Sequence, residues 1–209
     1  HFVPYSYCYR CPFGQEAGKC ELECGKYLEH VVEDSHSGVG HPAAILVESI
    51  QGEGGSVVPD ERFLPKIREV CDNNDILMID DEIQAGFCRT GKMFACEHTG
   101  IVPDIMTMSK ALGGVGFPIS AVAYKERLDT WPPGKHIGTF RGNMVAYAGG
   151  AAGIKFMLET NLADHALSLG EKMLGWLREL ERDTHIVGES RGKGLMLGVE
   201  FVRDQVTKE

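Results

Sequence analysis

Two reactive side chains, Asp81 and Lys110, each stand at the end of a short apolar run. The runs read Ile-Leu-Met-Ile-Asp-Asp-Glu-Ile-Gln at 76–84 and Ile-Met-Thr-Met-Ser-Lys at 105–110. The separation of 110 − 81 = 29 residues allows a loop or short helix and a return to the same edge of a parallel sheet. A lysine amine can form a Schiff base with an aldehyde, and a carboxylate can hold a proton on a pyridine nitrogen. The pair therefore predicts pyridoxal phosphate (PLP) chemistry.

The carboxylate is needed because PLP withdraws electrons only while its ring nitrogen carries a proton. At about 4 Å and an effective dielectric constant near 20, a carboxylate–cation pair is worth roughly 4 kcal/mol. That energy corresponds to about three pKa units, which keeps a weakly basic nitrogen protonated at neutral pH. An amide in place of the acid would lose most of this effect.

Spacing alone does not choose between Asp80 and Asp81, because successive side chains of a strand point to opposite faces. The two acids could also be a helix N-cap or a solvated strand end. Lys110 could be an exposed loop lysine, although a lysine that follows a buried strand is rarely buried without a partner. These alternatives stay open on the residues alone.

Three blocks of sequence together resemble one known family. They are MIDDEIQAGFCRTGKMFACEHTGIVPDIMTMSKALGGVGFP at 78–118, VESIQGEGG at 47–55 and GTFRGN at 138–143. In this order they resemble the class III (ω-type) PLP-dependent aminotransferases, and the resemblance covers nearly the whole chain. It implies PLP as the cofactor and the fold type I of PLP-dependent transferases, a mainly parallel α/β sheet flanked by helices.

The resemblance assigns roles around the cofactor. Lys110 matches the Schiff-base lysine, which also shuttles the proton of the 1,3-shift. Asp81 matches the acid at the pyridine nitrogen, which settles the ambiguity with Asp80 on family grounds. Ile83 is expected to pack on one face of the ring, and Gln84 is expected to hydrogen-bond near the 3-oxygen.

Two further residues are assigned by the resemblance alone. Glu53 matches a glutamate that pairs with a switchable arginine and so lets two substrates share one site. Thr139 matches a hydroxyl that reaches the cofactor phosphate from the neighbouring subunit. The family resemblance thus implies a homodimer with shared active sites. A third motif, Gly113-Gly114-Val115-Gly116, lacks the ending of a phosphate loop and is expected to be a flexible connector behind Lys110.

Within the family, the segments 7–14, 128–131 and 138–143 are similar to the diaminobutyrate–2-oxoglutarate branch. That similarity implies amino acid and 2-oxo acid substrates, namely L-2,4-diaminobutyrate/aspartate 4-semialdehyde and glutamate/2-oxoglutarate. The alternatives are an aminotransferase of the ornithine, 4-aminobutyrate or acetylornithine type, or an aminomutase of the same fold.

The chain has 209 residues, about half the length expected of this family. We therefore interpret it as an internal piece of a larger enzyme, and we expect the piece alone to be inactive. Residues 1–159 are expected to form the C-terminal half of a large PLP-binding domain. Residues 160–209 are expected to begin a small α+β C-terminal domain.

Composition limits the partners. Hydrophobic residues make up 43% of the chain, and the net charge is 21 − 30 = −9, which disfavours nucleic acid or an anionic membrane surface. The apolar runs are far shorter than the ~20 residues of a membrane span. These features are typical of a soluble cytoplasmic enzyme.

Alternating strands and helices are expected along the chain. Asp60 is expected to cap a helix with apolar positions at helical spacing, and a second long helix is expected at 143–159. A third, amphipathic helix starts near Leu162. The β-α-β order predicts a parallel sheet with helices on both faces and a site at the carboxyl ends of its strands. The expected strands are 43–48, 76–80, 104–108 and 119–123.

Four cysteines near the N-terminus offer a rival hypothesis. Cys8, Cys11, Cys20 and Cys24 read C-x2-C-x8-C-x3-C, which has the ligand count of a structural zinc site. The wide second pair and the short connection argue against a zinc ribbon, and seven cysteines in all do not suggest a disulfide framework. We interpret them as reduced thiols in a loop and the start of a helix, and we expect no metal in the active site. A zinc-stapled structural fragment is the remaining alternative.

Overall fold

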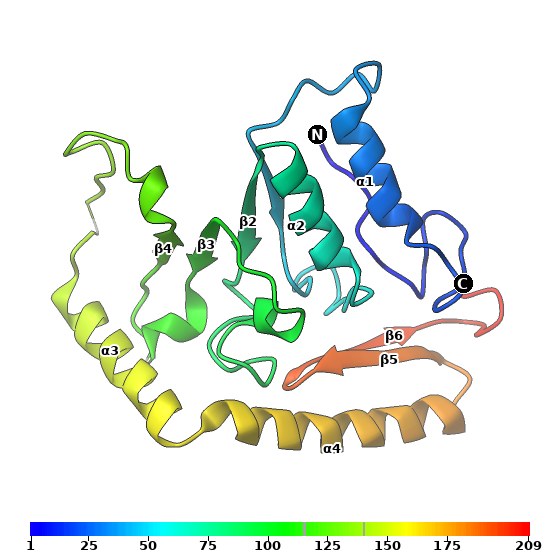
Figure 1. Ribbon diagram of the computed structural model, residues 1–209. Coiled ribbons are helices and arrows are strands. Elements are labelled where there is room, and N and C mark those ends of the chain that lie inside the picture. Colours follow the sequence, from blue (N-terminus) through cyan, green and yellow to red (C-terminus); the bar gives the residue numbers. More distant parts are fainter. Residues whose placement is uncertain (115, 140) are drawn as a thin grey trace.

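A four-stranded sheet organises the first part of the molecule. The computed structural model describes residues 1–114, 116–139 and 141–209. The strands lie side by side in chain order; β1 and β2 are parallel, as are β2 and β3, whereas β4 runs antiparallel to β3. The bounds are Ala44–Val47 for β1, Leu77–Asp81 for β2, Ile105–Met108 for β3 and Ala121–Tyr124 for β4 (Figure 1).

One face of this sheet is covered by two helices. Helix α2 (Phe63–Asn73) packs on β1 and β2, and α1 (Glu23–Glu33) packs on α2. Burial alternates along β2, where Met78 and Asp80 are buried and their neighbours are only half-buried, as expected when one face of a strand meets the core. The core between sheet and helices contains Leu28, Val47, Phe63, Leu64, Ile67, Ile76 and Met78.

The predicted cap of α2 is wrong. The N-cap position belongs to Arg62, and no side chain caps the helix there. The Asp60 carboxylate instead accepts a hydrogen bond from the Arg62 backbone N–H at 3.0 Å and from the Arg62 Nε at 2.8 Å. Asp60 thereby closes the turn that precedes the helix, a common use of aspartate.

Two long helices follow the sheet and are joined by a tight break. Helix α3 (Met144–Glu159) begins at Asn143, whose side chain accepts hydrogen bonds from the backbone N–H groups of Val145 and Ala146. Helix α4 (Leu162–Asp183) begins two residues after Thr160 and packs along the hairpin of β5 (Val187–Lys193) and β6 (Met196–Phe201). Three short 3-10 turns complete the elements: η1 (Ala95–His98), η2 (Lys110–Gly113) and η3 (Glu126–Leu128).

The hairpin is joined tightly to the rest of the chain. A Cβ on Gly170 of α4 would lie 1.9 Å from the Gly194 carbonyl oxygen at the hairpin turn, so only glycine permits this approach. The Leu195 N–H donates to the Arg89 carbonyl at 2.9 Å, and the Arg191 guanidinium donates to the Gly55 carbonyl at 2.8 Å. The hairpin therefore packs directly on the loops that follow β1 and β2.

The structure confirms the predicted fold class: a mainly parallel sheet flanked by helices. It differs in two details. Strand β4 is antiparallel to β3, and the described residues of the connection between them contain only the 3-10 turn η2 and no α-helix that crosses the sheet. Helix α3 packs against η2 and α4 rather than across the strands, so the described chain places α1 and α2 on one face of the sheet. In the described part of the chain, no helix is long and apolar enough to span a membrane.

Candidate active site

Asp81 lies at the carboxyl end of β2 on the face opposite α2. Its register partner on β3 is Thr107, so the two side chains share that face of the sheet. The Asp81 Oδ1 accepts the Ile83 N–H at 3.0 Å, which fixes the carboxylate at the start of the loop after β2. The Thr107 hydroxyl is buried and has no hydrogen-bond partner among the described residues. A carboxylate and an unsatisfied hydroxyl therefore lie next to each other at this strand end.

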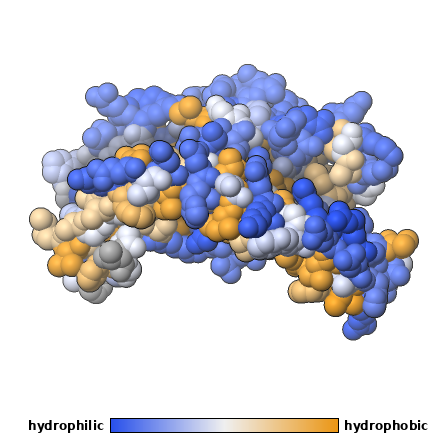
Figure 2. All heavy atoms as spheres, turned by 90° about the horizontal axis from the view of Figure 1, so that it is seen from below, coloured by the Kyte–Doolittle hydropathy of each residue, from blue (hydrophilic) through white to orange (hydrophobic). Residues whose placement is uncertain are grey.

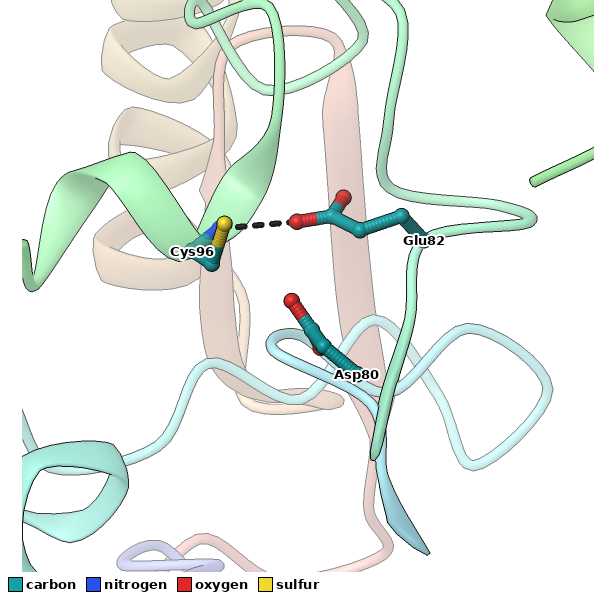
Figure 3. A group of neighbouring side chains, drawn as sticks. All are labelled: Asp80, Glu82 and Cys96. Carbon is teal, nitrogen blue, oxygen red and sulfur yellow. Dashed lines mark hydrogen bonds between the residues drawn. The ribbon is translucent and has the colours of Figure 1, made fainter. Parts of the chain in front are cut away.

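Asp80 points to the other face, into the core. Its carboxylate is fully buried and accepts hydrogen bonds from the Ser49 hydroxyl at 2.9 and 3.0 Å. Glu82 is also fully buried, and its Oε1 accepts the Cys96 N–H at 2.8 Å. Figure 3 shows Asp80 and Glu82 pointing toward Cys96 from the same strand end.

These two acids share one small volume. One ligand atom each from Asp80, Glu82 and Cys96 lies within 4.8 Å of the others. Burial raises the pKa of Asp80, and the neighbouring Glu82 carboxylate raises it further. The buried pair therefore retains a proton at a pH where a solvated aspartate would have lost it. Asp80 is a structural acid of the core, and Asp81 is the acid that faces the candidate site.

Lys110 follows β3 and opens η2. Its φ of 45° is in the left-handed region, an unusual conformation for a residue with a side chain. The Lys110 Nζ donates a hydrogen bond to the Gln84 Oε1. The sequence left open whether this lysine is buried or exposed, and in the structure Lys110 is exposed.

The Gln84 side chain packs directly against Gly52, a residue that the sequence analysis did not single out. A Cβ on Gly52 would lie 2.6 Å from the Gln84 Cδ, so any larger residue would displace the amide that meets Lys110. The Gly52 N–H donates to the Glu48 Oε2 at 2.8 Å, which fixes the turn after β1. Glu53, the next residue, is exposed on that turn. The repeated glycines of the 47–55 block are the signal that could have found Gly52.

The structure brings together some of the expected site residues and not others. Asp81, Ile83, Gln84 and Lys110 lie on the neighbouring loops after β2 and β3. Thr139 lies in an exposed segment, and no hydrogen bond among the described residues joins it to this group. Two residues of the family blocks, Val115 and Phe140, lie outside the described residues.

The groups present fit PLP. An amine at Lys110, an acid at Asp81 and an amide at Gln84 match the aldehyde, the ring nitrogen and the phenolic oxygen of the cofactor in donor and acceptor character. The unsatisfied Thr107 hydroxyl adds a polar group with no partner in the protein. Buried polar groups are almost always hydrogen-bonded, so a missing partner at this point is consistent with a polar ligand.

Comparison with known proteins defines the class. Residues 1–209 match the family described as Aminotransferase class-III, and the chain belongs to this family. A diaminobutyrate–2-oxoglutarate aminotransferase from Haemophilus influenzae is 49% identical over 210 aligned positions, which cover 100% of this chain and 46% of that protein. A leucine/methionine racemase from Thermococcus litoralis is 43% identical and is covered to 47%.

A solved structure supports the cofactor. The ornithine aminotransferase from Toxoplasma gondii superposes with a TM-score of 0.78 at 38% identity, over 85% of this chain and 41% of that one, and it was found with PLP at its active site. The family is PLP-dependent, which confirms the predicted cofactor. The chain spans about half the length of the curated relatives that it matches.

Proposed function

We propose that this chain forms the PLP-binding part of an aminotransferase. The observation that carries the proposal is the convergence of Asp81, Gln84 and Lys110 on the loops after two adjacent parallel strands. Bound PLP supplies an electron sink that makes a C–H bond next to an amino group acidic. Lys110 would hold the cofactor through its amine and carry the proton between carbon atoms. Asp81 would hold the proton on the pyridine nitrogen.

The remaining site residues would position the cofactor. Ile83 would lie against one face of the ring, and Gln84 would donate from its amide nitrogen while its oxygen accepts from Lys110. Gly52 supports Gln84, so the amide keeps its place when the lysine moves. Glu53, exposed beside Gly52, is free to pair with a mobile cation and so to let two substrates alternate.

For the substrates we propose L-2,4-diaminobutyrate/aspartate 4-semialdehyde and glutamate/2-oxoglutarate. The proposal is supported by the 49% identity with the Haemophilus influenzae enzyme over the whole of this chain. A second candidate is racemisation of a branched or sulfur-containing amino acid, which the 43% identity with the Thermococcus litoralis protein favours.

We further propose a cytoplasmic homodimer in which Thr139 reaches the cofactor phosphate of the partner subunit. The exposure of Thr139 supports this arrangement, as does the lack of any hydrogen bond between Thr139 and Asp81 or Lys110 among the described residues. Residues 1–159 would belong to the large domain and residues 160–209 to a smaller one. The break between α3 and α4 supports that division.

The test is a half-reaction on the full-length protein loaded with PLP. Adding L-2,4-diaminobutyrate without a 2-oxo acid should convert the cofactor to its pyridoxamine form, which is followed by its absorbance. A response to ornithine or 4-aminobutyrate but not to diaminobutyrate would overturn the substrate. Loss of optical activity from L-leucine or L-methionine with no change in cofactor form would favour the racemase.

One variant tests the cofactor assignment itself. Lys110→Ala should remove the visible absorbance of the lysine-bound cofactor and abolish turnover. Lys172→Ala is the matched control, because Lys172 is exposed on α4, where its amine lies over the Trp176 ring. If the visible absorbance persists in Lys110→Ala, another amine holds the cofactor.

A further inference from the structure

The N-terminal segment is a long stretch without helix or strand that is nevertheless fixed at several points. Residues 1–22 precede α1 and contain no regular element. The Tyr5 hydroxyl donates to the Glu48 carbonyl at 3.0 Å, and the Ser6 hydroxyl accepts the Asp60 N–H at 3.1 Å. Loops of this length without internal structure are uncommon in compact domains. Side-chain contacts of this kind, including the packing of Tyr5 against Phe63, hold the first part of the segment in place of backbone pairing.

The four N-terminal cysteines meet at one place in this segment. Cys8 and Cys11 come from the loop, Cys20 lies just before α1, and Cys24 lies in its first turn. All four line a single cavity of about 20 Å³. A cavity of this size holds about one water-sized occupant, which excludes an organic ligand and leaves room for a single ion.

The groups around the cavity suit a cation. All four cysteines are free thiols. The carboxylates of Glu23 and Asp60 line the same cavity, and the Glu23 Oε2 is buried without a hydrogen-bond partner among the described residues. The Arg62 guanidinium lies 3.8 Å from the Cys20 sulfur, where it can balance negative charge on a thiolate.

We propose that Cys8, Cys11, Cys20 and Cys24 bind one zinc ion as a structural site. Thiolates are soft ligands that select zinc, and four of them make the closed tetrahedral shell of a structural centre. On binding, each thiol gives up its proton, so four protons are released and the centre carries a net charge of −2. Arg62 offsets part of that charge. The site is separate from the PLP chemistry and does not depend on it.

The four thiols line the cavity, but their sulfur atoms do not yet form a closed coordination shell. Among the described residues, the only three potential ligand atoms that already lie within 4.8 Å of one another belong to Asp80, Glu82 and Cys96. Rotation of a cysteine between staggered χ1 positions moves its sulfur by about 3 Å. Closure of the shell therefore needs at least a rotation of the cysteine side chains.

The first experiment measures metal in the full-length, PLP-loaded protein, purified without a metal-affinity tag. We expect one zinc ion per chain by elemental mass spectrometry, and stepwise release of that zinc when a mercurial reagent titrates the thiols. Cobalt(II) in place of zinc should give the visible spectrum of a tetrahedral tetrathiolate. A metal-free protein in which Cys8, Cys11, Cys20 and Cys24 all react as free thiols would overturn the proposal, and so would a disulfide among these four cysteines.

Variants then locate the site. Cys11→Ser and Cys24→Ser should each lower the zinc content at least about tenfold at a fixed chelator concentration. Cys88→Gly is the matched control: it also removes one thiol, and its φ of 69° suits glycine, so zinc should stay at one per chain. Zinc that is unchanged in Cys11→Ser, or lost from Cys88→Gly, would place the ion elsewhere. These readouts do not involve transamination, so they stand or fall independently of the proposed function.

Discussion

Helices α2 and α3 are both rich in apolar residues, yet only α2 is buried. Leu64 on α2 is 1% exposed, whereas Leu158 on α3 is 61% exposed. The apolar positions of α2 follow helical spacing and face the sheet, while α3 is apolar on all sides and buries only a narrow stripe against η2 and α4. A helix that is apolar all round is normally buried. Figure 2 shows hydrophobic side chains gathered at the end of the molecule where α3 lies.

The two helices therefore mark two sides of the molecule that contribute differently. The α2 side of the sheet is completed by this chain, and it positions the strands whose ends carry Asp81 and Lys110. The α3 side is not completed by the described residues, and it is joined to the exposed segment that carries Thr139. Substitutions on the α2 side should therefore change stability, and substitutions on the α3 side should change assembly.

A large stability effect is expected at Asp104, which holds the α2 side together. Its buried carboxylate accepts from Arg68 at 2.7 Å and from the Met78 N–H at 2.9 Å, and it pairs with Lys125 at 2.8 Å. Asp104→Asn removes the buried charge that pairs with Arg68 and Lys125, at an expected cost of about 3 kcal/mol, because Arg68 keeps its pair with Asp72 and Lys125 is partly solvated. Chemical denaturation measures this difference in the free energy of unfolding. Asp129→Asn, on an exposed residue, is the control and should be nearly neutral.

The same residue has a pH signature. Burial alone would raise the pKa of Asp104, but hydrogen bonds from Lys125, the Met78 N–H and Arg68 outweigh it and hold the pKa well below its usual range. A carboxyl whose pKa is lower in the folded state stabilises the protein when the pH lies above its unfolded-state pKa of ~4. That stabilisation is lost as the pH falls below this value. In Asp104→Asn, the free energy of unfolding should therefore fall less steeply as the pH is lowered through the acid range. An unchanged acid transition would assign the effect to other carboxylates.

A matched pair of leucines tests the comparison directly. Leu64→Ala empties a packed position and should cost about 2–5 kcal/mol. Leu158→Ala makes the same chemical change on α3 and should cost no more than about 0.5 kcal/mol in the monomer. Unfolding by denaturant under monomeric conditions measures both values. Equal costs would mean that α3 is as well packed as α2 and would break the comparison.

The sequence predicted what depends on local pattern. The strands, α3, α4 and the order of the site residues follow from periodicity and from the family blocks. It missed features that depend on distant partners: the Ser49 hydroxyl that holds Asp80, and the unsatisfied hydroxyl of Thr107. The antiparallel β4 was missed because the connection after β3 is long enough for a crossover, and its sequence does not show in which direction the next strand runs. The cap of α2 was misplaced because Asp60 binds Arg62 in the preceding turn.

A substitution at Asp80 is expected to change how the free energy of unfolding depends on pH. Burial and the Glu82 carboxylate raise its pKa, so the folded chain binds a proton that the unfolded chain releases above pH ~4. Stability should therefore fall as the pH rises, by at most about 1.4 kcal/mol per pH unit. Asp80→Asn keeps the shape and can still accept from Ser49, so it should flatten this slope between pH 5 and 8, as measured by denaturation. An unchanged slope would show that the pair holds no extra proton.

The smallest effect on monomer stability, and the sharpest test of the α3 side, is expected at Phe156. Its side chain is 58% exposed, so Phe156→Asp should change the free energy of unfolding of the monomer by no more than about 0.5 kcal/mol. If α3 lies in the proposed subunit interface, the same change buries a charge there and should weaken association at least tenfold, or about 1.4 kcal/mol. Sedimentation of the full-length protein measures the association. Ser168→Asp introduces the same charge at an exposed position of α4 and should leave association unchanged. Phe156→Asp that dimerises like the parent would show that Phe156 does not lie in the subunit interface, because an aspartate buried there without a partner for its charge would weaken association.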